Sequence, residues 1–171
     1  KKGLEIECHT GNLSEWISKK NNKLTGVDLN SKALKIAKRY LDKNIHCNIE
    51  DEEFWNIIKD EKYDFITIMH VLEHLQNPWE TLKKLATHLT KEGQIIIALP
   101  NISNARDRYL QINGEFNYTL DGVMDKTHLR FFNQKTAREL IKESGLIIND
   151  YFSPWQISPI HYMLDHVPIL W

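Results

Sequence analysis

Four side chains stand out by their type and spacing: His70, Glu73 and His74 share one short segment, and His128 lies far along the chain. Imidazole titrates near neutral pH, which makes histidine the natural side chain to take a proton from a hydroxyl group. His128 and His74 are therefore the candidate catalytic bases. His74 follows an apolar run that predicts a strand, and His128 precedes Arg130 in a predicted loop.

The same segment also suits a second chemistry, because imidazole and carboxylate groups bind divalent cations. A spacing of three and one brings these side chains together only if the segment is helical or tightly turned. We expect no metal by default. The alternative is a cation held by His70, Glu73, His74 and His128.

Both histidines also have a structural interpretation. His74 could be a packing residue that hydrogen-bonds the backbone at a helix start, and His128 could anchor a loop by pairing with Asp125. The sequence leaves the catalytic and the structural roles open for each of them.

Apolar runs that alternate with helical patterns must position these residues. Strands are predicted at residues 4–8, 24–28, 45–49, 63–69, 95–99 and from 146. Between them, Asn30 or Ser31, Pro78 and Asn133 are suited to begin helices, and Gly145 is suited to end one. The periodicity weakens over residues 101–127, which predicts a functional loop or lid.

This alternation predicts an α/β protein: a Rossmann-like parallel sheet with helices on both faces. Ligands of such sheets bind at the carboxyl ends of the strands. The side chains expected there are those that follow the strands: residues 7–11, Asp28, residues 48–51, residues 70–74 and Asn101.

Composition narrows the class of partner. A chain of 171 residues with 42% hydrophobic and 26% charged residues suits one domain. The net charge of −1 and the absence of a basic run disfavour nucleic acid and anionic membranes, so a small or neutral molecule is expected. Cys8 and Cys47 lie in apolar contexts with no signal peptide or membrane span, which favours a cytoplasmic location.

From Leu4 to about Tyr151 the strand-end residues resemble the class I S-adenosylmethionine-dependent methyltransferases. In that family the first strand leads into D-x-G-x-G-x-G, and here the stretch is Glu5-Ile6-Glu7-Cys8-His9-Thr10-Gly11. Glu5 and Gly11 match, whereas Glu7 and His9 replace glycines. The spacing differs from the G-x-G-x-x-G of dinucleotide dehydrogenases, whose last glycine would fall at Asn12.

The resemblance implies S-adenosyl-L-methionine as the cofactor. Asp28 corresponds to the family acid that accepts hydrogen bonds from the ribose hydroxyls, and Asn48 replaces the acid that contacts adenine. Asp28 could instead cap the next helix, and Asn48 could be a plain loop residue. The full set of expected cofactor-binding residues is Glu5, Cys8, Gly11, Asp28, Leu29, Asn48, Ile49 and His70.

Two later segments carry the resemblance further. The segment His70-Val71-Leu72-Glu73-His74-Leu75 with Asn77-Pro78-Trp79 is similar to the family's D/E-V-L-E-H-L…P-W, and residues 93–101 are similar to its G-G-x-L-x-x-S-x-P-N. Residues 116–132 are similar to a signature of methyltransferases encoded beside glycan-assembly enzymes, which implies glycan biosynthesis and O-methylation of a sugar, glycan or small-molecule hydroxyl. The histidines and Glu73 also resemble the E-x-x-E-H…H metal set of small-RNA 2′-O-methyltransferases.

Glu7 and His9 support a rival interpretation. A side chain at a glycine position of this loop costs of order 1 kcal/mol in strain, and the Glu7 carboxylate would approach the expected methionine carboxylate. The alternative function is therefore a catalytically inactive methyltransferase-fold module for binding or scaffolding.

The expected domain covers residues 1–152, and residues 153–171 form an aromatic and proline-rich tail or lid. The sequence shows neither the family's leading helix nor a clear antiparallel seventh strand. A sheet without that strand would have an open edge, which a homodimer or a further segment would cover.

Overall fold

The computed structural model describes residues 1–151, and its centre is a five-stranded sheet in the order β3-β2-β1-β4-β5. The strands are β1 Lys2–Ile6, β2 Lys23–Asp28, β3 Lys43–His46, β4 Tyr63–Met69 and β5 Leu89–Ala98. Every neighbouring pair is parallel, and β1 lies between β2 and β4. The predicted α/β fold is confirmed. The predicted tail at 153–171 and any seventh strand beyond residue 151 lie outside the described residues.

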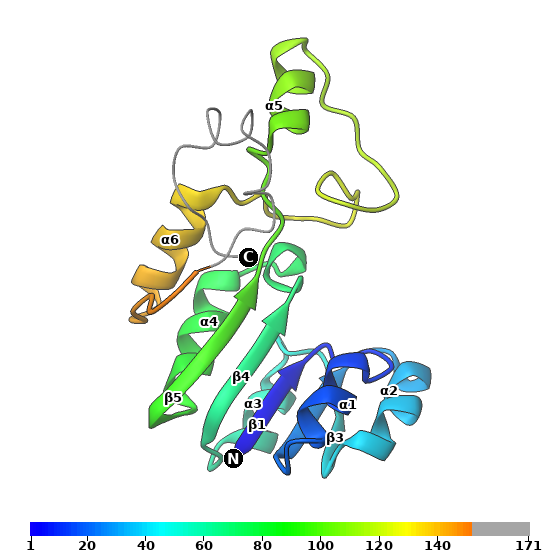
Figure 1. Cartoon of the computed structure of the whole chain (residues 1–171), viewed down its shortest axis with the longest axis vertical. Helices are drawn as coiled ribbons and strands as arrows, with labels where there is room; N and C mark the ends of the chain where they lie inside the picture. The colour runs from blue at the N-terminus through cyan, green and yellow to red at the C-terminus, as the bar shows by residue number, and fades with distance from the viewer. Residues whose placement is uncertain (152–171) are drawn as a thin grey trace.

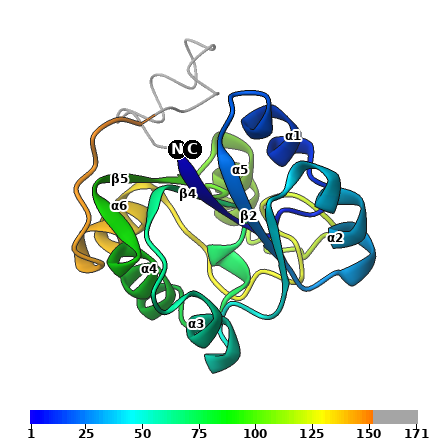
Figure 2. The ribbon, with the colours of Figure 1, turned by 90° about the horizontal axis from the view of Figure 1, so that it is seen from below.

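Helices cover both faces of the sheet. They are α1 Asn12–Ser18, α2 Ser31–Ala37, α3 Glu52–Ile58, α4 Pro78–Thr87, α5 Ala105–Ile112 and α6 Gln134–Glu143, with short 3₁₀ helices η1 Lys38–Tyr40 and η2 Leu72–His74. Figure 2 shows α1 and α2 on one side of the strands and α3, α4 and α6 on the other. The predicted caps hold: Asn30 caps α2, Pro78 opens α4 and Asn133 caps α6.

The middle of the sheet explains the apolar runs. Leu4 and Ile6 of β1 and Ile66 and Ile68 of β4 point to one face of the sheet and are at most 1% exposed. Glu5 of β1 and Thr67 of β4 point to the other face and are at most 4% exposed, so both strands are buried on both faces although these two residues are polar. Because β4 lies between β1 and β5, residues 63–69 form an interior strand, as predicted.

Three strands differ in their boundaries from the prediction, and the first of them, β1, ends at Ile6 rather than at residue 8. β5 begins at Leu89 rather than residue 95, so Gly93 lies inside it, beside a register shift between Tyr63 and Phe65 of β4. Such an irregularity admits polar residues that break the alternation expected of a strand. At the other edge β3 ends at His46, so the prediction that a strand covers 45–49 is wrong over its second half.

Two elements were misjudged. The predicted strand from residue 146 does not form, although Leu146 and Ile148 pack against the core while Ile147 is 87% exposed. The segment has the alternating burial of a strand but pairs with no described strand. Conversely, the predicted loop 101–127 contains α5, which Asn104 caps by accepting from the Asp107 N–H. Asparagine followed three residues later by an acid was the overlooked signal.

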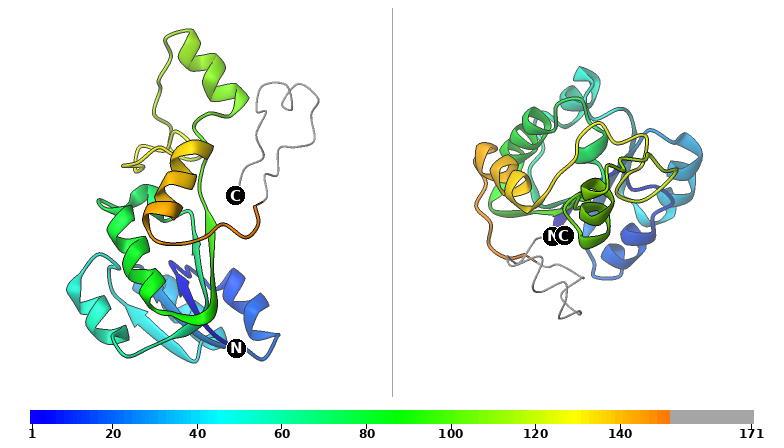
Figure 3. Two further views of the ribbon diagram at one scale, coloured as in Figure 1. Left: turned by 90° about the vertical axis from the view of Figure 1, so that its left-hand side faces the viewer. Right: turned by 90° about the horizontal axis from the view of Figure 1, so that it is seen from above.

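The carboxyl ends of the strands meet at one edge, and α5 with the chain that follows it lies beyond that edge (Figures 1 and 3). In this segment the rings of Phe116, Tyr118 and Phe131 contact one another, and Phe131 also contacts His128. We call residues 113–131 the acceptor loop. Within residues 1–151, no helix is long and apolar enough to cross a membrane.

Candidate active site

The loop after β1 has a left-handed backbone at three positions, two of which carry side chains instead of glycine. Glu7 and His9 have φ angles of 54° and 46°, in the left-handed region, and Gly11 has 85°. Left-handed backbone strains residues that carry a Cβ. At Gly11 a Cβ would stand 3.0 Å from the Ala37 Cα. The loop thus follows the path that glycines favour, and the side chains of Glu7 and His9 are exposed.

Asp28 closes β2 and holds this loop in place. Its Oδ2 accepts the His9 N–H at 2.6 Å, its Oδ1 accepts the Asn30 N–H at 2.7 Å, and the residue is 7% exposed. Asp28 does not cap α2, because Asn30 does so; its structural role is to hold the His9 and Asn30 amides. A carboxylate has about four acceptor positions, so these two bonds leave capacity for ribose hydroxyls.

Glu5 lies beneath the loop. It is 4% exposed, and its Oε2 accepts a hydrogen bond of 2.6 Å from the Ser14 hydroxyl at the start of α1. Burial raises the pKa of Glu5 to about 7, and the Ser14 bond opposes this. Cys8 is also buried and donates its N–H to the Val27 carbonyl. Ser14 was missed from the sequence, although a hydroxyl near a buried acid is the kind of partner to look for.

The pKa of Glu5 predicts how stability changes with pH. Because the folded state holds this proton more tightly than the unfolded chain, the stabilisation is complete below the unfolded pKa of 4.5 and is lost as pH rises through about 7. Relative to Glu5→Gln, the wild-type unfolding free energy should fall by about 3 kcal/mol over that window. Urea unfolding at pH 4.5 and 8 measures it, with the exposed Glu139→Gln as control. Parallel pH profiles for wild type and Glu5→Gln would contradict the prediction.

The residues after β2 and β3 are those that the resemblance assigns to the adenine and the ribose. The Asn48 Oδ1 accepts the Glu50 N–H at 3.0 Å, Ile49 is buried and Leu29 is 57% exposed. Asn48 also lines a cavity of about 330 Å³ between the starts of α3 and α4, together with Glu50 and Asn77. That cavity is lined by neither the β1 loop nor the histidines, so we do not place the reacting groups in it.

The segment after β4 turns tightly through η2. His70 has a φ of 57°, and its Nδ1 lies 3.5 Å from the Glu73 Oε1, an interaction that raises the pKa of His70 against the opposing effect of burial. Glu73 is 0% exposed, and among residues 1–151 neither of its carboxylate oxygens has a hydrogen-bond partner. The tight turn that the spacing required is thus present.

His74 and His128 meet at this turn. Their ring centroids are 4.8 Å apart in an edge-to-face arrangement. The His74 Nδ1 lies 3.2 Å from the Thr127 carbonyl, and the His128 Nδ1 lies 2.9 Å from the Val123 carbonyl. The His128 ring is therefore anchored by Val123 and not by the Asp125 carboxylate, which accepts from Thr127 instead.

Main-chain bonds fix the acceptor loop to η2. The Glu73 carbonyl accepts the N–H groups of Leu129 at 2.8 Å and Arg130 at 3.0 Å. The Arg130 guanidinium donates to the Gln76 carbonyl at 2.6 Å. Of the four side chains considered for a cation, the structure groups Glu73, His74 and His128, whose ligand atoms lie within 4.8 Å of one another. His70 contacts Glu73 but is not in that group.

The charge of Glu7 interacts both with Asp28 at the end of β2 and with residues of η2. Desolvation is the main cause of its raised pKa, the charge of His74 opposes it, and the charges of Asp28 and Glu73 add to it. Glu7 is thus within electrostatic reach of Asp28 on the cofactor side and of Glu73 and His74 on the other. The orienting groups Val123 and Thr127 were not identified from sequence, because backbone carbonyls leave no trace in residue type.

The comparisons with known proteins agree on one family. The family described as "Methyltransferase domain" matches residues 1–149. The curated relatives include a "Ubiquinone biosynthesis O-methyltransferase" of Coxiella burnetii (strain Dugway 5J108-111), 24% identical over 161 residues, or 93% of this chain and 66% of the relative. The chain therefore spans slightly less than two thirds of that relative's length.

Solved structures with the same fold include a SAM-dependent methyltransferase from Archaeoglobus fulgidus, with a TM-score of 0.68 and 22% identity over 90% of this chain and 65% of that one. Another is the plantazolicin methyltransferase BpumL in complex with SAH, with a TM-score of 0.57 and 24% identity over 82% of this chain and 54% of that one. At these identities the likeness bears on the fold.

Proposed function

Because the chain belongs to the methyltransferase domain family, we propose that it transfers a methyl group from S-adenosylmethionine to a hydroxyl of a sugar, glycan or small molecule. The observation that carries the proposal is the pair of imidazoles after the carboxyl end of β4, the strand that lies beside β1 and its loop. Transfer to a hydroxyl needs a group that handles its proton, and this pair supplies it.

The residues of the β1 loop and of Asp28 fit the cofactor. The loop has left-handed backbone at Glu7, His9 and Gly11, where the family has glycines, and Asp28 is a buried carboxylate with acceptor capacity to spare. Asp28 would accept from the ribose, while Asn48 and Ile49 would contact the adenine. The exposed Glu7 side chain is a feature opposed to the methionine carboxylate.

When bound, S-adenosylmethionine supplies the methyl group, whose bond to the sulfonium sulfur breaks as its bond to the acceptor oxygen forms. The chain's own contribution is position and proton handling. The His128 and His74 rings are held by backbone carbonyls, so their Nε2 atoms are the groups directed at the acceptor. The acceptor loop covers the reacting atoms and limits their contact with water.

The nature of the acceptor rests on two supports. The curated relatives are named O-methyltransferases, which favours an oxygen nucleophile. Beside His128, the rings of Phe116, Tyr118 and Phe131 offer apolar faces for the C–H face of a sugar or for a planar ring. The glycan-cluster signature in this same loop favours the sugar.

The second candidate is an inactive module that keeps the fold for binding or scaffolding. The observation that favours it is the pair of side chains at strained glycine positions, Glu7 and His9. Such a protein would bind neither S-adenosylmethionine nor S-adenosylhomocysteine.

Titration calorimetry with S-adenosylhomocysteine separates the two candidates. Wild type should bind, and Asp28→Ala should weaken binding by about 1.5–3 kcal/mol, the range for hydrogen bonds to a charged group. Asn30→Ala is the matched control, because it removes the α2 cap but keeps the carboxylate. If Asp28→Ala bound S-adenosylhomocysteine as tightly as wild type, Asp28 would not contact the cofactor and would only hold the His9 and Asn30 amides.

A further inference from the structure

We propose that a basic cleft between α3 and α4 binds a ligand that carries at least two phosphate groups. The cleft has a volume of about 440 Å³ and lies at the end of the sheet where β4 and β5 begin. The cofactor is expected at the opposite end, beyond the carboxyl ends of the strands. This ligand is therefore separate from S-adenosylmethionine, and the inference does not rest on the proposed function.

The charge of the cleft is the first support. Lys59, Lys62 and Lys84 line it, and no Asp or Glu within residues 1–151 does so. The cavity at the starts of α3 and α4 is different, because Glu50 and Asp51 line it together with Lys84. The net charge of the chain is −1, so a gathering of cations without acids is a local feature. Such a lining attracts anions.

Two of the three lysines have no carboxylate partner. Within residues 1–151, Lys59 has no hydrogen bond or ion pair, and the Lys62 ammonium donates only to the Thr87 carbonyl. Lys84 differs, because its Nζ lies 3.0 Å from the Glu80 Oε1. An ammonium group has three donors, so Lys62 keeps two of them for a ligand.

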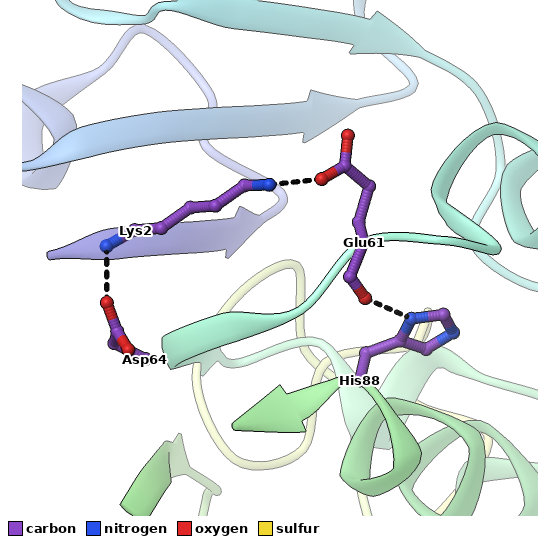
Figure 4. Close-up of polar contacts among 4 residues, drawn as sticks. All are labelled: Lys2, Glu61, Asp64 and His88. Atoms are coloured by element: carbon purple, nitrogen blue, oxygen red, sulfur yellow. Dashed lines mark hydrogen bonds and ion pairs between the residues drawn. The ribbon is translucent and has the colours of Figure 1, made fainter. Parts of the chain in front are cut away.

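The acids beside these lysines in the sequence do not neutralise them. Asp60 does not line the cleft, and the Glu61 carboxylate pairs with Lys2 of β1 (Figure 4). Lys59 and Lys62 thus leave two positive charges without a partner. Lysine binds phosphate groups as a point charge, and a diphosphate supplies at least two negative charges to match.

Trp55 bears on what the phosphate groups are attached to. Its half-buried ring lines the cleft, and the Lys84 Nζ lies 5.4 Å from the ring centroid. The base of a nucleoside diphosphate could pack against this ring, whereas pyrophosphate has no group to place there. The two sources share the phosphate chemistry and differ only in the contact with Trp55.

Both lysines also lie at helix ends, where cations are favourable without any ligand. Lys59 is the C-cap of α3, and Lys62 donates to the last turn of α4. A control must share this position. Lys38 is the C-cap of α2 and Lys35 lies in its last turn, on the other side of the sheet (Figure 2). Lys35→Ala with Lys38→Ala is therefore the matched control.

The test is titration calorimetry of the full chain with pyrophosphate in metal-free buffer. We expect one pyrophosphate per chain in wild type and in the control. Lys59→Ala with Lys62→Ala should bind at least about tenfold more weakly, because it removes two charged donors. Pyrophosphate should raise the melting temperature of wild type and of the control but not that of this cleft variant. Saturating S-adenosylhomocysteine should leave pyrophosphate binding unchanged.

Uridine diphosphate distinguishes the two sources. If it binds more tightly than pyrophosphate and Trp55→Leu abolishes the difference, the ligand is a nucleotide. If the two bind equally, the cleft recognises the phosphate groups alone. No binding of either ligand by wild type, equal loss of binding in the cleft variant and the control, or displacement of pyrophosphate by S-adenosylhomocysteine would overturn the inference.

Discussion

Replacing His128 with alanine is expected to lower the rate of methyl transfer by about 10²–10⁴-fold while leaving the affinity for S-adenosylhomocysteine unchanged. The His128 ring belongs to the acceptor side, where it contacts His74 and Phe131. Its loss removes proton handling but no group of the β1 loop. Transfer of a labelled methyl group to a panel of sugars, glycans and phenols measures the rate.

His88→Ala serves as the control for this substitution, since the His88 ring faces the Glu61 carbonyl at the end of the sheet where β4 and β5 begin (Figure 4). If His128→Ala lowered cofactor affinity as much as turnover, His128 would be a structural anchor of the acceptor loop and not a group that acts on the acceptor.

The double substitution Glu7→Gly with His9→Gly is expected to stabilise the protein and to tighten cofactor binding. Left-handed backbone costs a residue with a Cβ about 1–2 kcal/mol, and the extra unfolded-state freedom of glycine returns part of this, so the net gain should be about 1 kcal/mol per site. Removing the Glu7 carboxylate also removes a charge that opposes the methionine carboxylate. We expect about tenfold tighter binding of S-adenosylmethionine.

Asn21→Gly is the matched control for strain, because Asn21 also has a left-handed φ, of 55°, but lies in the turn between α1 and β2. It should change stability slightly and cofactor affinity not at all. If neither wild type nor the double variant bound S-adenosylmethionine, the obstruction would not be these two side chains, and the inactive binding module would be the surviving interpretation.

Most strands and helices could be predicted from the sequence, because they depend on regularly spaced apolar side chains and on capping residues. The almost unbroken apolar run of β4 is typical of a strand buried on both faces, and Asn30 and Asn133 marked helix starts by their capping chemistry. The prediction failed where a strand depends on hydrogen bonding to a neighbouring strand. Residues 146–148 alternate in burial as a strand does, yet a strand forms only when a neighbour offers its backbone.

The candidate site could likewise be predicted only in part. Residue types put forward Asp28, His74 and His128 as candidates, and the segment that carries Glu73 and His74 does turn tightly, through η2. Sequence could not show that the buried Glu73 oxygens would lack hydrogen-bond partners within residues 1–151, or that Val123 and Thr127 would orient the histidines. Those properties arise from main-chain groups brought together across the fold, and no single residue type encodes them.

The main-chain hydrogen bonds between η2 and the acceptor loop suggest how proteins of this family could change their substrate during evolution. The Glu73 carbonyl receives the amide groups of Leu129 and Arg130, so this attachment uses atoms that every residue but proline possesses. Substitutions in the loop can therefore accumulate without detaching it. A loop transplanted from a homologue should dock on the same carbonyl, which makes residues 113–131 the natural segment to exchange when a new acceptor specificity is sought.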